Sequence, residues 1–315
     1  MTDTGPLFVS SSDLIADRRY KWALDHAARG DFAGAAEILV QTVELVPHFA
    51  TAWFALGAIR DRLGERREAI VAFEHARDAD PEDYHGARLQ LARLGAGDAT
   101  PAMTQTYVRR LFDQYAGRYD TALTEKLAYR GPALLRDGVA AAMWRLSRPM
   151  HFAAMLDLGC GTGLAGAAFR SVVDRLAGVD LSEAMIAQAS TKGLYDRLVA
   201  KDLADMLGDE AASGATYNLV IAADVFVYVS DLRPAVEKIA RILAPDGLLA
   251  FTVETFCGEG VKLLPTLRYA HSEAYIRGAL DAAGLAALRF AAASVRSEKG
   301  MPVEGLVVVA QPSTA

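Results

Sequence analysis

The stretch LDLGCGTG, residues 156–163, decides the fold of this chain. The apolar run over residues 153–158 predicts a buried β-strand, and a helix is expected from about Leu164. A strand that passes through a glycine-rich turn into a helix is typical of parallel α/β sheets, whose ligands lie outside the carboxyl ends of the strands. The glycines let a ligand approach the backbone, because no Cβ stands in the way. The loop is therefore predicted to line a ligand site.

Two kinds of cofactor fit the spacing of this loop. Gly161-x-Gly163-x-x-Gly166 matches the fingerprint of dinucleotide-binding proteins, and Asp180 follows at about the spacing of the ribose-binding acid. On spacing alone, a nicotinamide dehydrogenase remains possible. However, Asp157 lies just before the turn, where a pyrophosphate prefers a helix N-terminus without nearby anions. S-adenosylmethionine carries an ammonium and a sulfonium instead of phosphates, so the charge pattern favours S-adenosylmethionine.

Three further predicted strands each lead to an acidic residue. The strands and their acids are residues 175–179 with Asp180, residues 198–200 with Asp202, and residues 217–222 with Asp224. We expect Asp180 to accept hydrogen bonds from both ribose hydroxyls. Asp202 is expected to accept from the adenine amino group, with Leu203 over the ring. Asp224 either lines the same pocket or caps the turn that follows it.

Three more strands complete the predicted sheet, over residues 247–253, 285–291 and 305–310. The last two are separated by a loop without a crossover helix. Parallel neighbours need such a crossover, so these two strands are expected to pair antiparallel.

The motifs together resemble the class I S-adenosylmethionine-dependent methyltransferases of the type-11/type-12 group. The segments that carry the resemblance are LDLGCGTG (156–163), GVDLSEAMIAQA (178–189), AKDL (200–203) and NLVIAADVFVYV (218–229). The resemblance implies an α/β fold with a doubly wound seven-stranded sheet of order 3-2-1-4-5-7-6, the last strand antiparallel. It also implies cofactor-binding roles for Asp157, Gly159, Gly161, Gly163, Asp180, Leu181, Asp202, Leu203 and Asp224.

An internal repeat precedes this region. Five positions recur with a period of 34 residues, at Gly30 and Gly64, Ala35 and Ala69, Leu39 and Phe73, Thr42 and Ala76, and Pro47 and Pro81. The second copy, with Trp53, Gly57 and Phe73, resembles a tetratricopeptide repeat. This resemblance implies a small all-α domain that either holds a protein partner or packs as a helical support.

Glycine, alanine and proline over residues 95–101 mark a boundary, which predicts three regions. These are a tetratricopeptide-type helical domain (1–98), a linker with lid helices (99–149) and a methyltransferase domain (150–315). Helices are expected over residues 107–119 and 121–135. The first has an aromatic and apolar face that is either a lid over the cofactor or an ordinary buried stripe, formed by Tyr107, Leu111, Phe112, Tyr115 and Tyr119.

Composition narrows the partners and the compartment. The net charge of −6 argues against nucleic acid or an anionic membrane surface as the main partner. Two cysteines cannot form a disulfide framework, which suits a reducing cytoplasm. No charge-free apolar run approaches the roughly 18 residues of a membrane span. No metal ligation is expected.

The predicted function is methyl transfer from S-adenosylmethionine to an oxygen, nitrogen or carbon nucleophile of a small-molecule or protein substrate. Tyr228 and His271 are the candidate catalytic residues. The methyl group on the sulfonium of the cofactor is already activated for transfer. The protein therefore chiefly aligns the two reactants and needs no conspicuous catalytic motif. The alternative is a tetratricopeptide adaptor whose α/β domain binds the cofactor without turnover.

Overall fold

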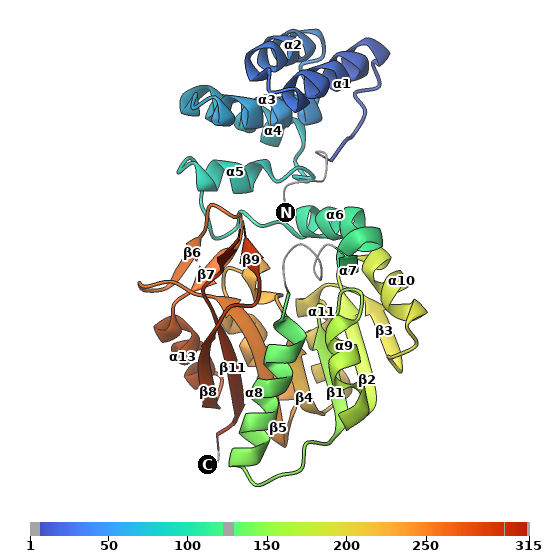
Figure 1. Ribbon diagram of the computed structural model, residues 1–315, viewed down its shortest axis with the longest axis vertical. Coiled ribbons are helices and arrows are strands. Elements are labelled where there is room, and N and C mark those ends of the chain that lie inside the picture. Colours follow the sequence, from blue (N-terminus) through green and yellow to red (C-terminus); the bar gives the residue numbers. More distant parts are fainter. Residues whose placement is uncertain (1–6, 122–128, 299, 314–315) are drawn as a thin grey trace. The chain divides into compact units, whose positions relative to one another are not determined.

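The computed structural model describes residues 7–121, 129–298 and 300–313 (Figure 1). The chain divides into two compact units. The first comprises Met1–Arg110 with Pro265–Leu267, and the second comprises Leu111–Leu264 with Arg268–Ala315.

The first unit consists of short helices that pack in antiparallel pairs. They are α1 (Leu14–Ala28), α2 (Phe32–Leu45), α3 (Ala50–Arg62), α4 (Arg66–Ala79) and α5 (Ala87–Arg93). The starts of α2 and α4 are 34 residues apart, as the repeat requires. A Cβ on Gly57 of α3 would lie 2.7 Å from the ring of Phe73 of α4, so only glycine allows these helices to approach so closely. The short α5 places Leu91 and Leu94 beside Phe73 and ends the stack.

The second unit is a sheet covered by helices on both faces. The boundary between the units lies within α6. The helices of this unit are α6 (Gln105–Tyr115), η1 (Ala116–Arg118), α7 (Tyr119–Thr121), α8 (Gly131–Arg145), α9 (Leu164–Phe169), η3 (Arg170–Val172), α10 (Glu183–Thr191), α11 (Leu203–Ser213), η4 (Phe226–Tyr228), α12 (Arg233–Ile242) and α13 (Glu273–Ala282). Its strands are β1 (Phe152–Leu158), β2 (Val173–Asp180), β3 (Arg197–Ala200), β4 (Tyr217–Ala222), β5 (Leu243–Glu254), β6 (Val261–Leu263), β7 (Tyr269–His271), β8 (Leu285–Ala293), β9 (Ser297–Glu298), β10 (Met301–Pro302) and β11 (Gly305–Pro312).

The main path of the sheet runs in the order β3-β2-β1-β4-β5-β11-β8. Strands β1 to β5 pair in parallel, whereas β11 is antiparallel to both β5 and β8. In this numbering, the sixth and seventh predicted strands are β8 and β11. The short strands β6 and β7 were not expected; they form an antiparallel pair beside the end of β5.

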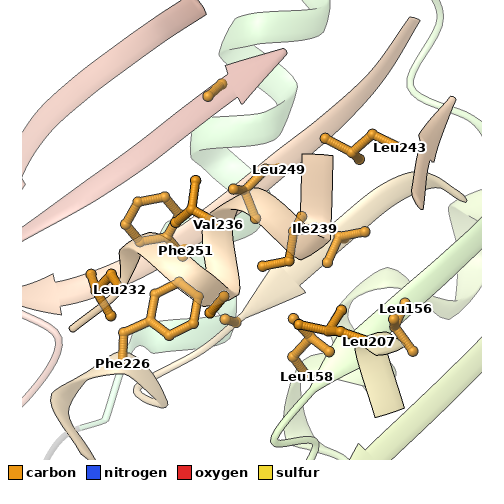
Figure 2. Close-up of a cluster of buried hydrophobic side chains, with 14 of the residues drawn as sticks. Leu156, Leu158, Leu207, Phe226, Leu232, Val236, Ile239, Leu243, Leu249 and Phe251 are labelled. Carbon is orange, nitrogen blue, oxygen red and sulfur yellow. The ribbon is translucent and has the colours of Figure 1, made fainter. Parts of the chain in front are cut away.

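Two apolar layers hold the helices against the sheet. On one face, Val236 and Ile239 of α12 pack on the central strands, and the rings of Phe226 and Phe251 meet at 5.1 Å between their centroids (Figure 2). On the other face, Leu135 of α8 packs with residues of β1, β4, β5 and β11. Both faces of the central strands are therefore buried, which explains why their sequences read as continuous apolar runs.

The helices before the sheet differ from the sequence-based expectation. The predicted helix over residues 107–119 ends earlier, since α6 stops at Tyr115 and a short η1 follows, which contains Gly117. The predicted helix over residues 121–135 lies partly outside the described residues. Within the described part it is wrong for Tyr129 and Arg130, because α8 begins only at Gly131, with a proline in its first turn.

No helix among the described residues is long and apolar enough to cross a bilayer. A cluster of three or more potential metal ligands is likewise absent from the described part of the chain.

Candidate cofactor and acceptor site

The glycine loop lies between β1 and α9, at the carboxyl edge of the sheet. Gly159, Gly161 and Gly163 have φ angles of +61°, +52° and +93°, a region that residues with a side chain rarely adopt. A Cβ on Gly159 would lie 2.5 Å from a methyl carbon of Val225, whereas a Cβ on Gly161 would meet nothing closer than Tyr119, at 3.7 Å. The ring of Tyr119 therefore lies at van der Waals distance from the Cβ position of Gly161, and no atom approaches it more closely.

Asp157 is a buried carboxylate directly before this loop. Its Oδ2 accepts a hydrogen bond of 2.7 Å from the hydroxyl of Tyr195. Its Oδ1 is buried and has no hydrogen-bond partner among the described residues. Burial raises the pKa of Asp157 to about 7, and the negative charge of Asp180 adds to this shift. The hydrogen bond from Tyr195 and, more weakly, the backbone N–H of Gly166 oppose it. An unpaired, buried acceptor atom of this kind fits a cationic group of a ligand.

Asp180 ends β2 and stands next to the loop. Its Oδ2 accepts from the backbone N–H of Gly161 at 2.9 Å, and its Oδ1 accepts from that of Ser182 at 2.9 Å. Each carboxylate oxygen has a second lone pair, so both remain able to accept from a pair of hydroxyls. Burial raises the pKa of Asp180, and the two backbone hydrogen bonds oppose the shift. Leu181 follows directly and is half-buried.

Asp202 and Leu203 lie at the next strand end, after β3. Asp202 caps α11, accepting from the backbone N–H groups of Ala204 at 2.7 Å and Asp205 at 3.2 Å. Leu203 begins the helix and is half-buried. The structure thus gives Asp202 a local capping role, and its predicted contact with adenine stays a prediction.

Asp224 follows β4 and has an unusual backbone. Its φ of +59° is in the left-handed region, although it is not a glycine. Its N–H donates to Thr252 Oγ1 of β5 at 2.8 Å, and its carboxylate accepts from Arg268 Nη1 at 3.0 and 3.1 Å. A strained backbone held by such contacts is typical of functional sites.

Asp224 belongs to a cluster of four buried charges. Glu254, at the end of β5, lies 2.8 Å from Arg296 Nη2 and 3.6 Å from Arg268 Nη1. Arg296 also lies 3.5 Å from Asp224. Burial raises the pKa of Glu254, and the two arginines oppose the shift. With two acids and two arginines the formal charges balance, so this cluster joins the ends of β4 and β5 to the segments that follow β6 and β8.

The two candidate catalytic residues lie close to this cluster. Tyr228 of η4 packs edge-on against Phe112, with ring centroids 5.3 Å apart, and the guanidinium of Arg268 lies 5.0 Å from its ring centre. His271 is fully buried, and its Nε2–H donates to the carbonyls of Val229 and Ser230. Burial lowers the pKa of His271 to about 4. His271 therefore serves the packing of this loop as a neutral ring, and its catalytic role stays a prediction.

Residues 111–121 are tied to the cofactor side by polar contacts. Ser182 Oγ donates to Asp113 Oδ1 at 2.5 Å. Asp120 accepts from the hydroxyl of Thr162 and from Lys192 Nζ, the latter at 2.7 Å. Of the predicted aromatic and apolar face, Tyr115 is buried, and Leu111, Phe112 and Tyr119 pack near Met185 of α10; Tyr107 belongs to the helical unit. The role of this face as a lid over the cofactor stays a prediction.

Sequence reasoning missed Tyr195 and the three partners of Asp224. Arg268 follows Asp224 by 44 residues, and no local pattern connects the two. One signal was available for Tyr195. A glycine inside a strand often marks the close approach of another group, and Gly178 lies within β2 against the Tyr195 ring.

The comparisons with known proteins address the α/β unit. Residues 156–251 match the sequence model of a family described as a methyltransferase domain. This part of the chain is therefore similar to a methyltransferase domain. Human methyltransferase-like protein 27 is 39% identical over 99 residues, which are 31% of this chain and 38% of that protein. The chain thus spans less than half the length of this curated relative.

Solved structures share the fold. Magnesium protoporphyrin IX methyltransferase from Synechocystis, with bound S-adenosylhomocysteine, is 19% identical with a TM-score of 0.50, covering 66% of this chain and 99% of that one. The 1,6-didemethyltoxoflavin N1-methyltransferase from Burkholderia thailandensis is 20% identical with a TM-score of 0.50, covering 66% and 88%. The prediction of an α/β methyltransferase fold with a mixed sheet is confirmed.

Proposed function

We propose that the α/β unit binds S-adenosylmethionine and transfers its methyl group to an oxygen, nitrogen or carbon nucleophile of a small-molecule or protein substrate. The observation that carries this proposal is the buried Oδ1 of Asp157, which has no hydrogen-bond partner among the described residues and lies next to a loop of three glycines with positive φ angles. A second acid, Asp180, lies close enough to raise the pKa of the first. Two adjacent acids favour a cationic ligand over a pyrophosphate.

The residues at the strand ends divide between the parts of the cofactor. We propose that Asp157 and the glycines hold the methionyl part and that Asp180 and Leu181 hold the ribose. Asp202 and Leu203 hold the adenine, and Asp224 lines the pocket near the methyl group. The order of these strands in the sheet, β3-β2-β1-β4, supports this division, since adenine, ribose, methionyl and methyl sites then follow one another along the edge.

When bound, the cofactor supplies a methyl group that its sulfonium has already activated. The chain's own residues then have to align the acceptor with that methyl and exclude water. Tyr119, whose ring lies over Gly161, supports a role of residues 111–121 in covering the cofactor. Tyr228, between Phe112 and Arg268, lines the acceptor side and is the better placed of the two candidate catalytic residues.

The helical unit is proposed to be of the tetratricopeptide type and to bind the substrate protein or another partner. The 34-residue offset of α2 and α4 and the contact of Gly57 with Phe73 support the repeat type. A cytoplasmic location is proposed from the two free cysteines, Cys160 and Cys257.

Calorimetric titration with S-adenosylmethionine tests the proposal. We expect a saturable heat for the wild type and a loss of affinity of at least about tenfold for Asp180→Ala, which removes two charged acceptor atoms. Asp78→Ala, at an exposed acid on α4 of the helical unit, is the matched control and should bind as the wild type does. No saturable heat with the wild type would refute the proposal.

A turnover assay distinguishes a methyltransferase from an adaptor that only binds the cofactor. Incubation with methyl-labelled cofactor and a cell extract should transfer label to an acceptor. Cofactor binding without any transfer, together with one stoichiometric protein partner, would instead favour the adaptor.

A further inference from the structure

Three glycines around the cofactor loop surround one side chain, that of Tyr195. A Cβ on Gly178 would lie 2.7 Å from the Tyr195 ring, and a Cβ on Gly163 would lie 3.0 Å from it. A Cβ on Gly166 would collide with the Tyr195 hydroxyl. These glycines lie on β2, in the loop and on α9, so three separate elements leave room for the same ring.

The position of this ring also explains why residue 166 is a glycine. In the dinucleotide fingerprint, the third glycine serves close packing between helix and strand. Here Gly166 faces the hydroxyl of Tyr195, which comes from the loop between α10 and β3. The match of Gly166 to that fingerprint therefore has a local explanation that involves no pyrophosphate.

The Tyr195 hydroxyl donates a hydrogen bond to Asp157 Oδ2 at 2.7 Å. This leaves Oδ1 as the buried oxygen without a partner among the described residues. With one oxygen held by a donor, the carboxylate cannot rotate freely, and the orientation of its second oxygen is fixed.

We propose that Tyr195 is a positioning residue that orients Asp157 and keeps it ionised, so that Oδ1 can accept a hydrogen bond from the ammonium group of S-adenosylmethionine. This inference rests on the proposed function and deepens it. A hydroxyl that donates to a carboxylate favours the charged form, whereas burial and the nearby Asp180 favour the neutral form. Tyr195 thus offsets part of the penalty for placing two acids together.

The test is the pH dependence of cofactor affinity, measured by calorimetry between about pH 5.5 and pH 9 for the wild type and for Tyr195→Phe. The wild type should bind more tightly as the pH rises through about 7, because Asp157 then becomes ionised. The variant keeps the ring but loses the donor, so its binding transition should move up by about one pH unit. At pH 7 its affinity should fall by about 5- to 20-fold.

Tyr217→Phe is the matched control. The Tyr217 hydroxyl also donates to a buried carboxylate, Glu210 Oε2 at 2.5 Å, but Tyr217 lies at the amino end of β4, away from the loop. This control should retain the wild-type pH profile. Infrared titration of the cofactor-free protein gives a second measurement, because the band assigned to protonated Asp157, absent in Asp157→Asn, should persist to higher pH in Tyr195→Phe.

The outcomes distinguish a failure of the Tyr195 role from a failure of cofactor binding. An unshifted pH profile for Tyr195→Phe, or an equal weakening at every pH, would overturn the positioning role while leaving cofactor binding intact. Absence of cofactor binding by the wild type at every pH would overturn the proposed function itself and this inference with it.

Discussion

The carboxyl edge of the sheet holds two pairs of acids in opposite surroundings. Asp157, near the end of β1, and Asp180, the last residue of β2, have no lysine or arginine within ion-pairing distance among the described residues, and burial raises the pKa of both. Asp224 and Glu254, after β4 and at the end of β5, are held by two buried arginines. The first pair carries uncompensated charge and the second does not.

This difference in compensating charge suits the first pair to ligand binding and the second pair to holding the fold together. An uncompensated buried carboxylate is costly, so a site that keeps one is suited to a ligand that brings the opposite charge. In the balanced cluster each acid faces an arginine of opposite charge, and the cluster joins distant segments of the chain. The same sheet edge thus combines a region prepared for a cation with a region that is complete without one.

The largest expected effect comes from breaking the balanced pair. Arg268→Met leaves Asp224 and Glu254 with one arginine between them, and removing one partner of a buried ion pair typically costs about 3 to 5 kcal/mol. The loss should appear as a lower midpoint in urea unfolding. Arg233→Met is the control, because its ion pair with Asp231 is exposed and should cost about 1 kcal/mol or less. Equal losses in the two variants would contradict the comparison.

Asp157, which has no cationic partner among the described residues, should instead make the free energy of unfolding depend on pH. The folded-state pKa of Asp157 is about 7, above the roughly 3.9 of an unfolded chain, so its protonation stabilises the fold at low pH. That contribution should be lost as the pH rises from about 4 to about 7 and then level off, a change on the order of 2 to 4 kcal/mol. Urea unfolding of the cofactor-free wild type, with Asp157→Asn subtracted at each pH, measures it. A flat difference would show that Asp157 is not buried as described.

The smallest expected effect concerns the contacts of the proposed lid. Asp113→Ala removes the acceptor of the Ser182 hydroxyl, and because Asp113 is exposed the free energy of unfolding should fall by about 1 kcal/mol or less. Hydrogen exchange over residues 111–121 should quicken. Arg109→Ala, at an exposed position of the same helix, should leave that exchange rate unchanged. Unchanged exchange in Asp113→Ala would remove the support for a lid.

The sequence was sufficient for the seven strands on the main path of the sheet and for the loop, but not for the short strands β6, β7, β9 and β10. The apolar runs before Asp180 and Asp224 predicted β2 and β4 to within two residues at each end, because strands that are buried on both faces must be continuously apolar. The glycines at 159–163 were informative because positive φ angles restrict those positions to glycine.

The rest depended on contacts between distant residues. Tyr195 and Asp157 are 38 residues apart, and Arg268 belongs to a segment after β6 that has no periodic pattern. Arginines and tyrosines occur throughout such segments, and only the folded chain shows which of them meet an acid. The balanced cluster could therefore not be distinguished beforehand from ordinary surface charges.

A crystal structure of the protein grown with equal concentrations of S-adenosylmethionine and NAD would test the central claim most directly. We predict density for S-adenosylmethionine alone, with its ammonium next to Asp157 and its ribose on Asp180. A pyrophosphate bound over the backbone of Gly161 would contradict the account, because it would show that the two uncompensated acids do not select a cation.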